Sequence, residues 1–102
     1  MVHHIVTWKL KDSFSAEERE KALAQLKEKV ETLRAIPGVA GFEFTSCINQ
    51  KTTLSADLVL HSSHYGQDEL KEYYVHPVHL AFVESVKGLI EFRELLDFEI
   101  VN

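Results

Sequence analysis

The chain has 102 residues, a formal net charge of -5 at pH 7, 45% hydrophobic residues and 26% charged residues. This length and composition predict one globular domain spanning residues 1–102 and exclude a multidomain architecture. The acidic balance and the lack of a Lys/Arg cluster exclude nucleic acid as a partner, because contacts to phosphates need a basic face. A domain this small buries only about two thirds of its unfolded surface, so we expect a homodimer.

The sequence carries no pattern of membrane insertion or export. No stretch approaches the roughly 18 consecutive apolar residues that a membrane-spanning helix needs. The N-terminus lacks the features of a signal peptide, and we therefore expect mature structure from the first residues and a cytoplasmic location. The single cysteine, Cys47, excludes an internal disulfide and is best interpreted as a half-buried strand residue.

The first third of the chain predicts a strand and then a long helix. Alternation of residue types over residues 2–10 indicates a strand, with one face made by Val2, His4, Val6, Trp8 and Leu10. Ser15 and Glu18 have the spacing of a capping box, and apolar residues recur at helical spacing over residues 15–35. Residues 36–38, Ile-Pro-Gly, end this helix because proline lacks an amide donor and glycine tolerates a left-handed turn.

The remainder predicts two strands, an interrupted helix and a last strand. The strands are expected at 42–48 and 56–61, the loop at 62–66, the helical segments at 67–74 and 79–89 on either side of Pro77, and the last strand at 92–101. The order β-α-β-β-α-β predicts an α+β, ferredoxin-like fold, in which helices cover one face of a four-stranded antiparallel sheet. The other face needs a cover, which a second sheet would supply.

The segment from Tyr73 to His79 holds most of the residues suited to proton transfer. Tyr73, His76 and His79 follow one another at spacings of three, and the bend at Pro77 would aim Tyr73 and His79 at one pocket. His4 lies among apolar residues of the first strand and therefore needs a polar partner, which is either a backbone carbonyl or Asp57. The alternative interpretation makes these histidines structural, with His76 capping a helix carbonyl.

The histidine pairs His61-x-x-His64 and His76-x-x-His79 repeat one spacing, which raises the question of a metal site. Zinc needs about three protein ligands, and the sequence has no third ligand at a recognised spacing. His61 and His64 are more simply residues of a strand end and a loop. The chain also has no glycine-rich phosphate loop and no nucleophile elbow. We therefore predict no metal and no cofactor.

Several segments together resemble the stress-responsive A/B barrel (Dabb) family. They are His4-Ile5-Val6-x-Trp8-Lys9-Leu10-Lys11-Asp12, Ile36-Pro37-Gly38-Val39, Asp57-Leu58-Val59-Leu60, Tyr73-x-x-His76-Pro77-x-His79 and Leu96-Asp97-Phe98-Glu99. The resemblance implies a dimeric α/β barrel made of two ferredoxin-like protomers. It also implies catalytic roles for His79, Tyr73 and His4, by similarity to a plant polyketide cyclase of the family that needs no cofactor.

In such a mechanism the histidine removes a proton and the tyrosine hydrogen-bonds the developing oxyanion. We expect a small-molecule pocket between sheet and helices, lined also by Val6, Trp8, Asp57, Val59, His76 and Phe82. The first helix lacks the aromatic residues that shape the pocket of the cyclase, so the substrate of the cyclase cannot be assigned to this chain. Two alternatives stay open: a stress-associated binding or structural dimer without activity, and a cofactor-free monooxygenase of the same superfamily.

Overall fold

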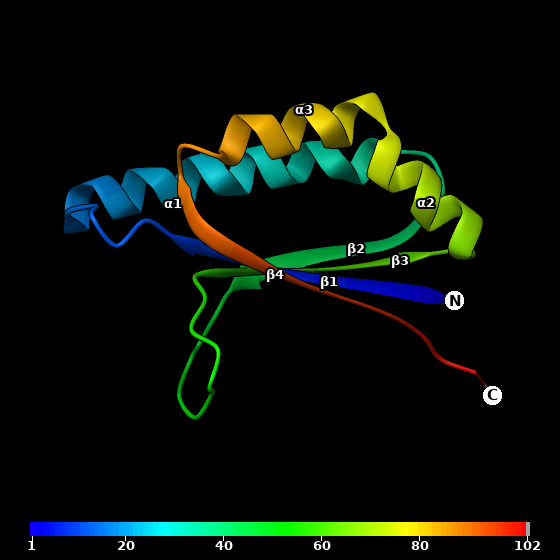
Figure 1. Cartoon of the computed structure of the whole chain (residues 1–102), viewed down its shortest axis with the longest axis horizontal. Coiled ribbons are helices and arrows are strands. Elements are labelled where there is room, and N and C mark those ends of the chain that lie inside the picture. Colours follow the sequence, from blue (N-terminus) through cyan, green and yellow to red (C-terminus); the bar gives the residue numbers. More distant parts are fainter. Residues whose placement is uncertain (102) are drawn as a thin grey trace.

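A computed structural model of the chain describes residues 1–101 and has the predicted α+β architecture (Figure 1). The strands are β1 (Val2–Leu10), β2 (Val39–Ser46), β3 (Leu58–His64) and β4 (Ile90–Glu99). The helices are α1 (Ala16–Glu31), the 3-10 helix η1 (Thr32–Ala35), α2 (Gln67–Val75) and α3 (Pro77–Val86). Neighbouring strands are antiparallel in the order β2-β3-β1-β4, which is the ferredoxin-like arrangement.

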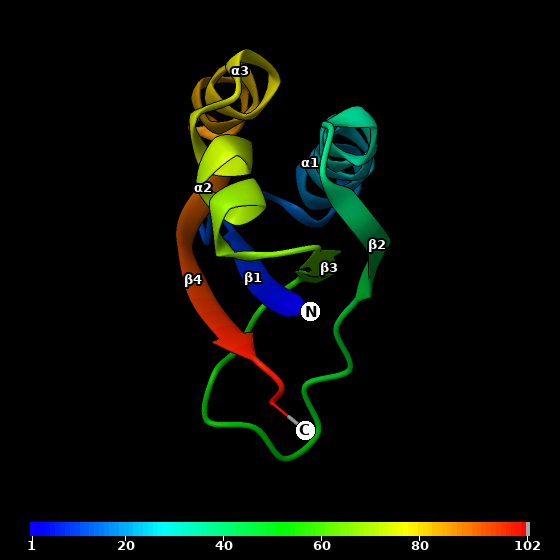
Figure 2. The ribbon, with the colours of Figure 1, turned by 90° about the vertical axis from the view of Figure 1, so that its right-hand side faces the viewer.

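All helices lie on one face of the sheet, as Figure 2 shows. The predicted capping box begins α1: Ser15 Oγ accepts from the Glu18 amide at 3.1 Å, and Glu18 Oε1 accepts from the Ser15 amide at 2.9 Å. After η1, Gly38 turns the chain into β2 with a φ of 89°. A side chain there would be strained by this φ and would also crowd Glu69, whose Cβ lies 3.1 Å from the position of the missing Cβ.

Pro77 separates two helices, as predicted. It is the first residue of α3, where the lack of an amide hydrogen costs nothing. His76 ends α2 and caps α3: its Nδ1 accepts a hydrogen bond from the Val78 amide at 3.1 Å. The alternative interpretation of His76 was therefore wrong in detail, because the ring caps an amide and not a carbonyl.

Strand β3 is longer than predicted. The residues expected to form a loop, Ser62 to His64, continue the strand and pair with both β1 and β2. Side chains three apart on a strand point to opposite faces, so His61 is exposed while His64 is fully buried beneath the helices. The spacing that suggested a shared metal site instead separates these two rings.

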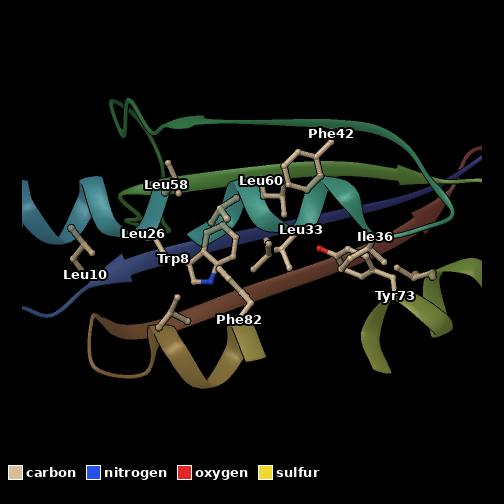
Figure 3. Close-up of a cluster of buried hydrophobic side chains, with 14 of the residues drawn as sticks. Trp8, Leu10, Leu26, Leu33, Ile36, Phe42, Leu58, Leu60, Tyr73 and Phe82 are labelled. Carbon is tan, nitrogen blue, oxygen red and sulfur yellow. The ribbon is translucent and has the colours of Figure 1, made fainter. Parts of the chain in front are cut away.

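The hydrophobic core lies between the sheet and the helices (Figure 3). The predicted inward face of β1 is buried throughout, whereas the opposite face of the sheet carries no helix. Strand β4 is an edge strand with several exposed apolar side chains, among them Leu96 (59% exposed) and Phe98 (37% exposed). Within residues 1–101, no helix is long and apolar enough to span a membrane.

Candidate functional site

A cavity of about 80 Å³ lies between the helix-covered face of the sheet and helices α2 and α3. All three predicted catalytic residues, His4, Tyr73 and His79, line it. The remaining lining residues are Val6, Trp8, Leu33, Tyr74, Phe82, Val83, Val86, Arg93 and Leu95. Residues from both ends of the chain therefore meet at one cavity, and they include the three residues for which the family resemblance implies catalytic roles.

Tyr73 and His79 form the polar part of the α2–α3 side of the cavity. Their ring centroids are 4.8 Å apart, across the bend at Pro77. Tyr73 is fully buried and His79 is half-buried. The Tyr73 hydroxyl and the His79 Nδ1 are both buried, and neither has a hydrogen-bond partner in residues 1–101. Unpaired buried polar atoms are rare in folded proteins, and two beside one small cavity are suited to binding a polar group of a ligand.

His4 is held from the opposite side by β4. Its Nδ1 lies 2.6 Å from Asp97 Oδ1, and the two residues are direct partners in the pairing of β1 with β4. A carboxylate accepts hydrogen bonds only, so the Nδ1 carries the hydrogen and the ring's tautomer is fixed. The Tyr74 hydroxyl lies 3.0 Å from the same Nδ1 and donates to Asp97 Oδ2 at 2.7 Å. Three side chains from β1, β4 and α2 thus form one network.

Burial sets the protonation states at the cavity. It lowers the pKa of His79 below the ordinary 6.5, and the neighbouring His4 acts in the same direction. His79 is therefore neutral at pH 7 and able to accept a proton. Burial raises the pKa values of Tyr73 and Tyr74 well above the ordinary 10, so both hydroxyls keep their hydrogens. The site combines a neutral imidazole with a phenolic donor.

Three residues predicted for the pocket lie elsewhere. Asp57 sits just before β3, where it accepts hydrogen bonds from Arg19 Nη1 at 2.9 Å and from the Leu10 amide at 2.7 Å. The suggested pairing of His4 or His79 with Asp57 is therefore wrong, because Asp57 joins α1 to β1. Val59 faces the uncovered side of the sheet, and His76 caps α3 at the surface.

Val6, Trp8 and Phe82 do line the cavity, with the Trp8 and Phe82 rings packed edge to face at 5.7 Å. Figure 3 shows these two rings and Tyr73 in the layer between helices and sheet. Their part in ligand binding stays a prediction.

Sequence reasoning missed Asp97, Tyr74 and Arg93. Arg93, Leu95 and Asp97 follow one another at a spacing of two residues, so all three lie on the side of β4 that faces the helices. A carboxylate at that place in the last strand was a usable signal, since in this fold β4 pairs with β1. Tyr74 had no comparable signal beside Tyr73.

The cavity residues suit an organic ligand better than a metal ion. Among residues 1–101, no group of three or more His, Cys, Asp or Glu side chains is placed to hold a metal ion. The polar groups of the residues that line the cavity are two phenols, two imidazoles, the Trp8 indole N–H and the Arg93 guanidinium, surrounded by apolar side chains. Such a lining fits a small, mostly apolar molecule with one oxygen-bearing group.

Comparison with known protein families gives a match over residues 2–100 to the stress responsive A/B barrel domain. No curated protein matches the chain. A dimeric protein of unknown function with a ferredoxin-like fold, from Bacteroides fragilis, is 29% identical with a TM-score of 0.80, covering 97% of this chain and 95% of its own.

Two further structures show the same fold. A Dabb family protein from Mesorhizobium loti is 24% identical with a TM-score of 0.76, and the match covers 99% of this chain and 97% of the other. The hydroxynitrile lyase from Passiflora edulis is 17% identical with a TM-score of 0.80, and the match covers 98% of this chain and 93% of the other. The second likeness is too distant to bear on activity.

Proposed function

Since this chain belongs to the stress-responsive A/B barrel (Dabb) family, we propose that it is a cofactor-independent enzyme that moves a proton on a small carbonyl or hydroxyl compound. The observation that carries this proposal is the pair of unpartnered polar atoms at the cavity, the Tyr73 hydroxyl and the His79 Nδ1, among residues 1–101. Packing alone gives no reason to bury both. A ligand oxygen and an adjacent acidic hydrogen would satisfy them together.

In the proposed reaction, Tyr73 donates a hydrogen bond to the ligand oxygen and His79 accepts a proton from the neighbouring carbon or hydroxyl. As the proton leaves, negative charge develops on the oxygen, where a fixed donor stabilises it most. His79 is suited to be the base because burial keeps its imidazole neutral. The protonated ring then returns the proton to the product, so no external oxidant or cofactor enters the balance.

His4 is proposed to complete the site from the sheet side. Its bond to Asp97 fixes the ring and would stabilise a positive charge on it, as carboxylates do beside catalytic imidazoles. The exposed Arg93 at the cavity offers a partner for an anionic group on the ligand. The Passiflora edulis neighbour shows the fold alone, but because it is described as a hydroxynitrile lyase, we include a cyanohydrin among the test compounds.

The proposal is tested with small probes whose chemistry reports proton transfer directly. Deuterium uptake by hydroxyacetone and acetylacetone in D₂O and cyanide release from acetone cyanohydrin would be followed for the wild type, Tyr73→Phe and His79→Gln. We expect turnover above the buffer rate for at least one probe, with a loss of about 100-fold in either variant. Equal rates in wild type and both variants would instead favour a binding protein without catalysis.

One specific observation supports the alternative of a stress-associated dimer without enzymatic activity. The uncovered sheet face exposes Leu96 and Phe98, and the Bacteroides fragilis neighbour is described as dimeric. We propose that a second copy of this chain covers that face, in agreement with the predicted homodimer. This assembly is compatible with the enzymatic proposal, because the cavity lies on the other side of the sheet.

A further inference from the structure

We propose that Tyr74 determines ligand length, by separating the catalytic cavity from a second hollow on the same side of the sheet. This hollow, the outer groove, has a volume of about 430 Å³ and is lined by Val2, Gln67, Leu70, Lys71, Tyr74, Asp97, Phe98 and Glu99. Among residues 1–101, Tyr74 is the one residue that lines both spaces. The inference rests on the proposed function, since it concerns ligands of the same site.

The two spaces follow each other along β4. Arg93 and Leu95 line the cavity, whereas Asp97 and Glu99, further along the same side of the strand, line the outer groove. Tyr74 reaches from α2 across this boundary, and its hydroxyl donates to Asp97 Oδ2 at 2.7 Å. Its ring packs at 5.3 Å from His4 and 5.6 Å from His79, measured between centroids. The tyrosine is thus fixed at both ends as a partition.

The volumes explain why the partition matters. A dry protein cavity that admits benzene has about 150 Å³, so the catalytic cavity at about 80 Å³ holds only the reacting end of a ligand. Drug-sized ligands occupy pockets of about 300–1,000 Å³. The outer groove falls in that range, and its apolar Val2 and Leu70 fit an alkyl tail, with Lys71 at the side to meet a polar end. Joining both spaces would therefore admit a longer molecule.

The Tyr74 hydroxyl keeps its hydrogen at neutral pH. Hydrogen bonding within the network needs the Tyr74 O–H as donor, and burial raises the pKa of this group so that it does not ionise at neutral pH. Tyr74 is only half-buried, and its hydroxyl is held by its contacts with His4 and Asp97. Removing the ring is the direct way to open the boundary.

A first experiment measures the opening without any assumption about catalysis. Trp8 is the only tryptophan, is 2% exposed and lines the catalytic cavity, so its fluorescence reports access to that space. We expect acrylamide to quench Trp8 several-fold more efficiently in Tyr74→Ala than in the wild type, with Tyr74→Phe close to the wild type. Tyr65→Ala, at an exposed tyrosine, serves as the matched control. Unchanged quenching in Tyr74→Ala would overturn the partition.

The second experiment measures length selectivity with methyl ketones, titrating 2-butanone and 2-nonanone against Trp8 fluorescence. In the wild type we expect the added methylenes to gain little, whereas in Tyr74→Ala each one that enters the groove should tighten binding about fourfold. Tyr74→Leu is the second variant if the alanine variant does not fold. If Tyr74→Ala tightens the binding of both ketones equally, the proposal is overturned, because the substitution would then only enlarge the cavity without opening it to the groove. If the wild type shows no proton transfer but Tyr74→Ala still gains affinity for the longer ketone, the proposed function is refuted and the role of Tyr74 stands.

Discussion

Tyr73 and His79 lie with their ring centroids 4.8 Å apart, and each brings to the cavity a buried polar atom that has no partner in the part of the chain that the structure describes. This arrangement costs stability, because a buried donor or acceptor without a partner loses its hydration and gains nothing in return. A site kept at such a cost is typical of residues that act on a ligand.

Tyr73→Phe should therefore separate stability from activity. The variant removes an unpaired hydroxyl and keeps the ring, so we expect the free energy of unfolding to stay equal or to rise by about 1 kcal/mol. The turnover of any probe that the wild type accepts should fall about 100-fold, since one oxyanion donor is lost. Urea unfolding and initial rates check the two parts.

Tyr65→Phe is the matched control for this variant, because Tyr65 is 66% exposed and outside the cavity. It should change neither quantity measurably. Marked destabilisation by Tyr73→Phe would show that the hydroxyl is satisfied in solution, and would remove the main argument for the site.

The pH dependence of turnover should follow His79. Its folded-state pKa is lowered below 6.5 by burial, and only the neutral imidazole accepts a proton. We expect kcat/KM to be constant near pH 7 and to fall as the pH drops through a midpoint below 6.5. No alkaline decline is expected near pH 9, since the pKa of Tyr73 is raised above the ordinary 10. An acidic midpoint above 6.5 would exclude a buried His79 as the base.

Local patterns in the sequence were enough to predict most of the fold. The capping box of α1, the stop at Gly38 and the break at Pro77 depend on neighbouring residues alone, and all three are present. The end of β3 was missed because Ser62, Ser63 and the following Gly66 favour turns by composition. Pairing on both sides, with β1 and β2, outweighs that preference.

The hydrogen-bond partners of the site residues were harder to predict than the site residues themselves. His4 and Tyr73 were identified as residue types suited to chemistry, but Asp97 is 93 positions from His4 in the sequence and is brought beside it only by the register of β1 against β4. Asp57 was chosen instead because it adjoins an apolar strand. It meets Arg19, whose reach from α1 no local pattern reveals.

The buried His64 should make the protein less stable in mild acid. Burial lowers the pKa of His64 from 6.5 to about 4, and its Nε2 lies 2.9 Å from Ser62 Oγ. Between these pH values the unfolded chain binds a proton that the folded chain excludes, so stability is lost as the pH falls. The full loss is roughly 3 kcal/mol. Urea midpoints at several pH values between the two limits would measure it.

His64→Gln removes one of two titrations and should reduce this pH dependence between the two limits, even if the variant is less stable at pH 7. The dependence that remains belongs to His79, whose pKa is also lowered by burial. His61→Gln, at an exposed position of the same strand, should leave the pH dependence as it is. Carboxylates such as Asp12 and Glu18, whose pKa values are lowered, lose their contribution as the pH falls below their ordinary values of 3.8 and 4.5, so they do not mimic the effect between about pH 5 and 6.5. Equal slopes in wild type and His64→Gln would show that His64 is protonated in the folded state.

The uncovered sheet face gives the last prediction. Leu96 is 59% exposed and is paired with Ile5 on that face, where a carboxylate would lose its hydration if a second copy packed against it. We expect Leu96→Glu to shift the protein from dimer to monomer in analytical ultracentrifugation, at concentrations where the wild type is dimeric. Leu80→Glu makes the same change at a similar exposure of 54%, but on α3, and should leave the dimer intact. Dissociation by Leu80→Glu and not by Leu96→Glu would place the interface on the helices, and a monomeric wild type would refute the dimer itself.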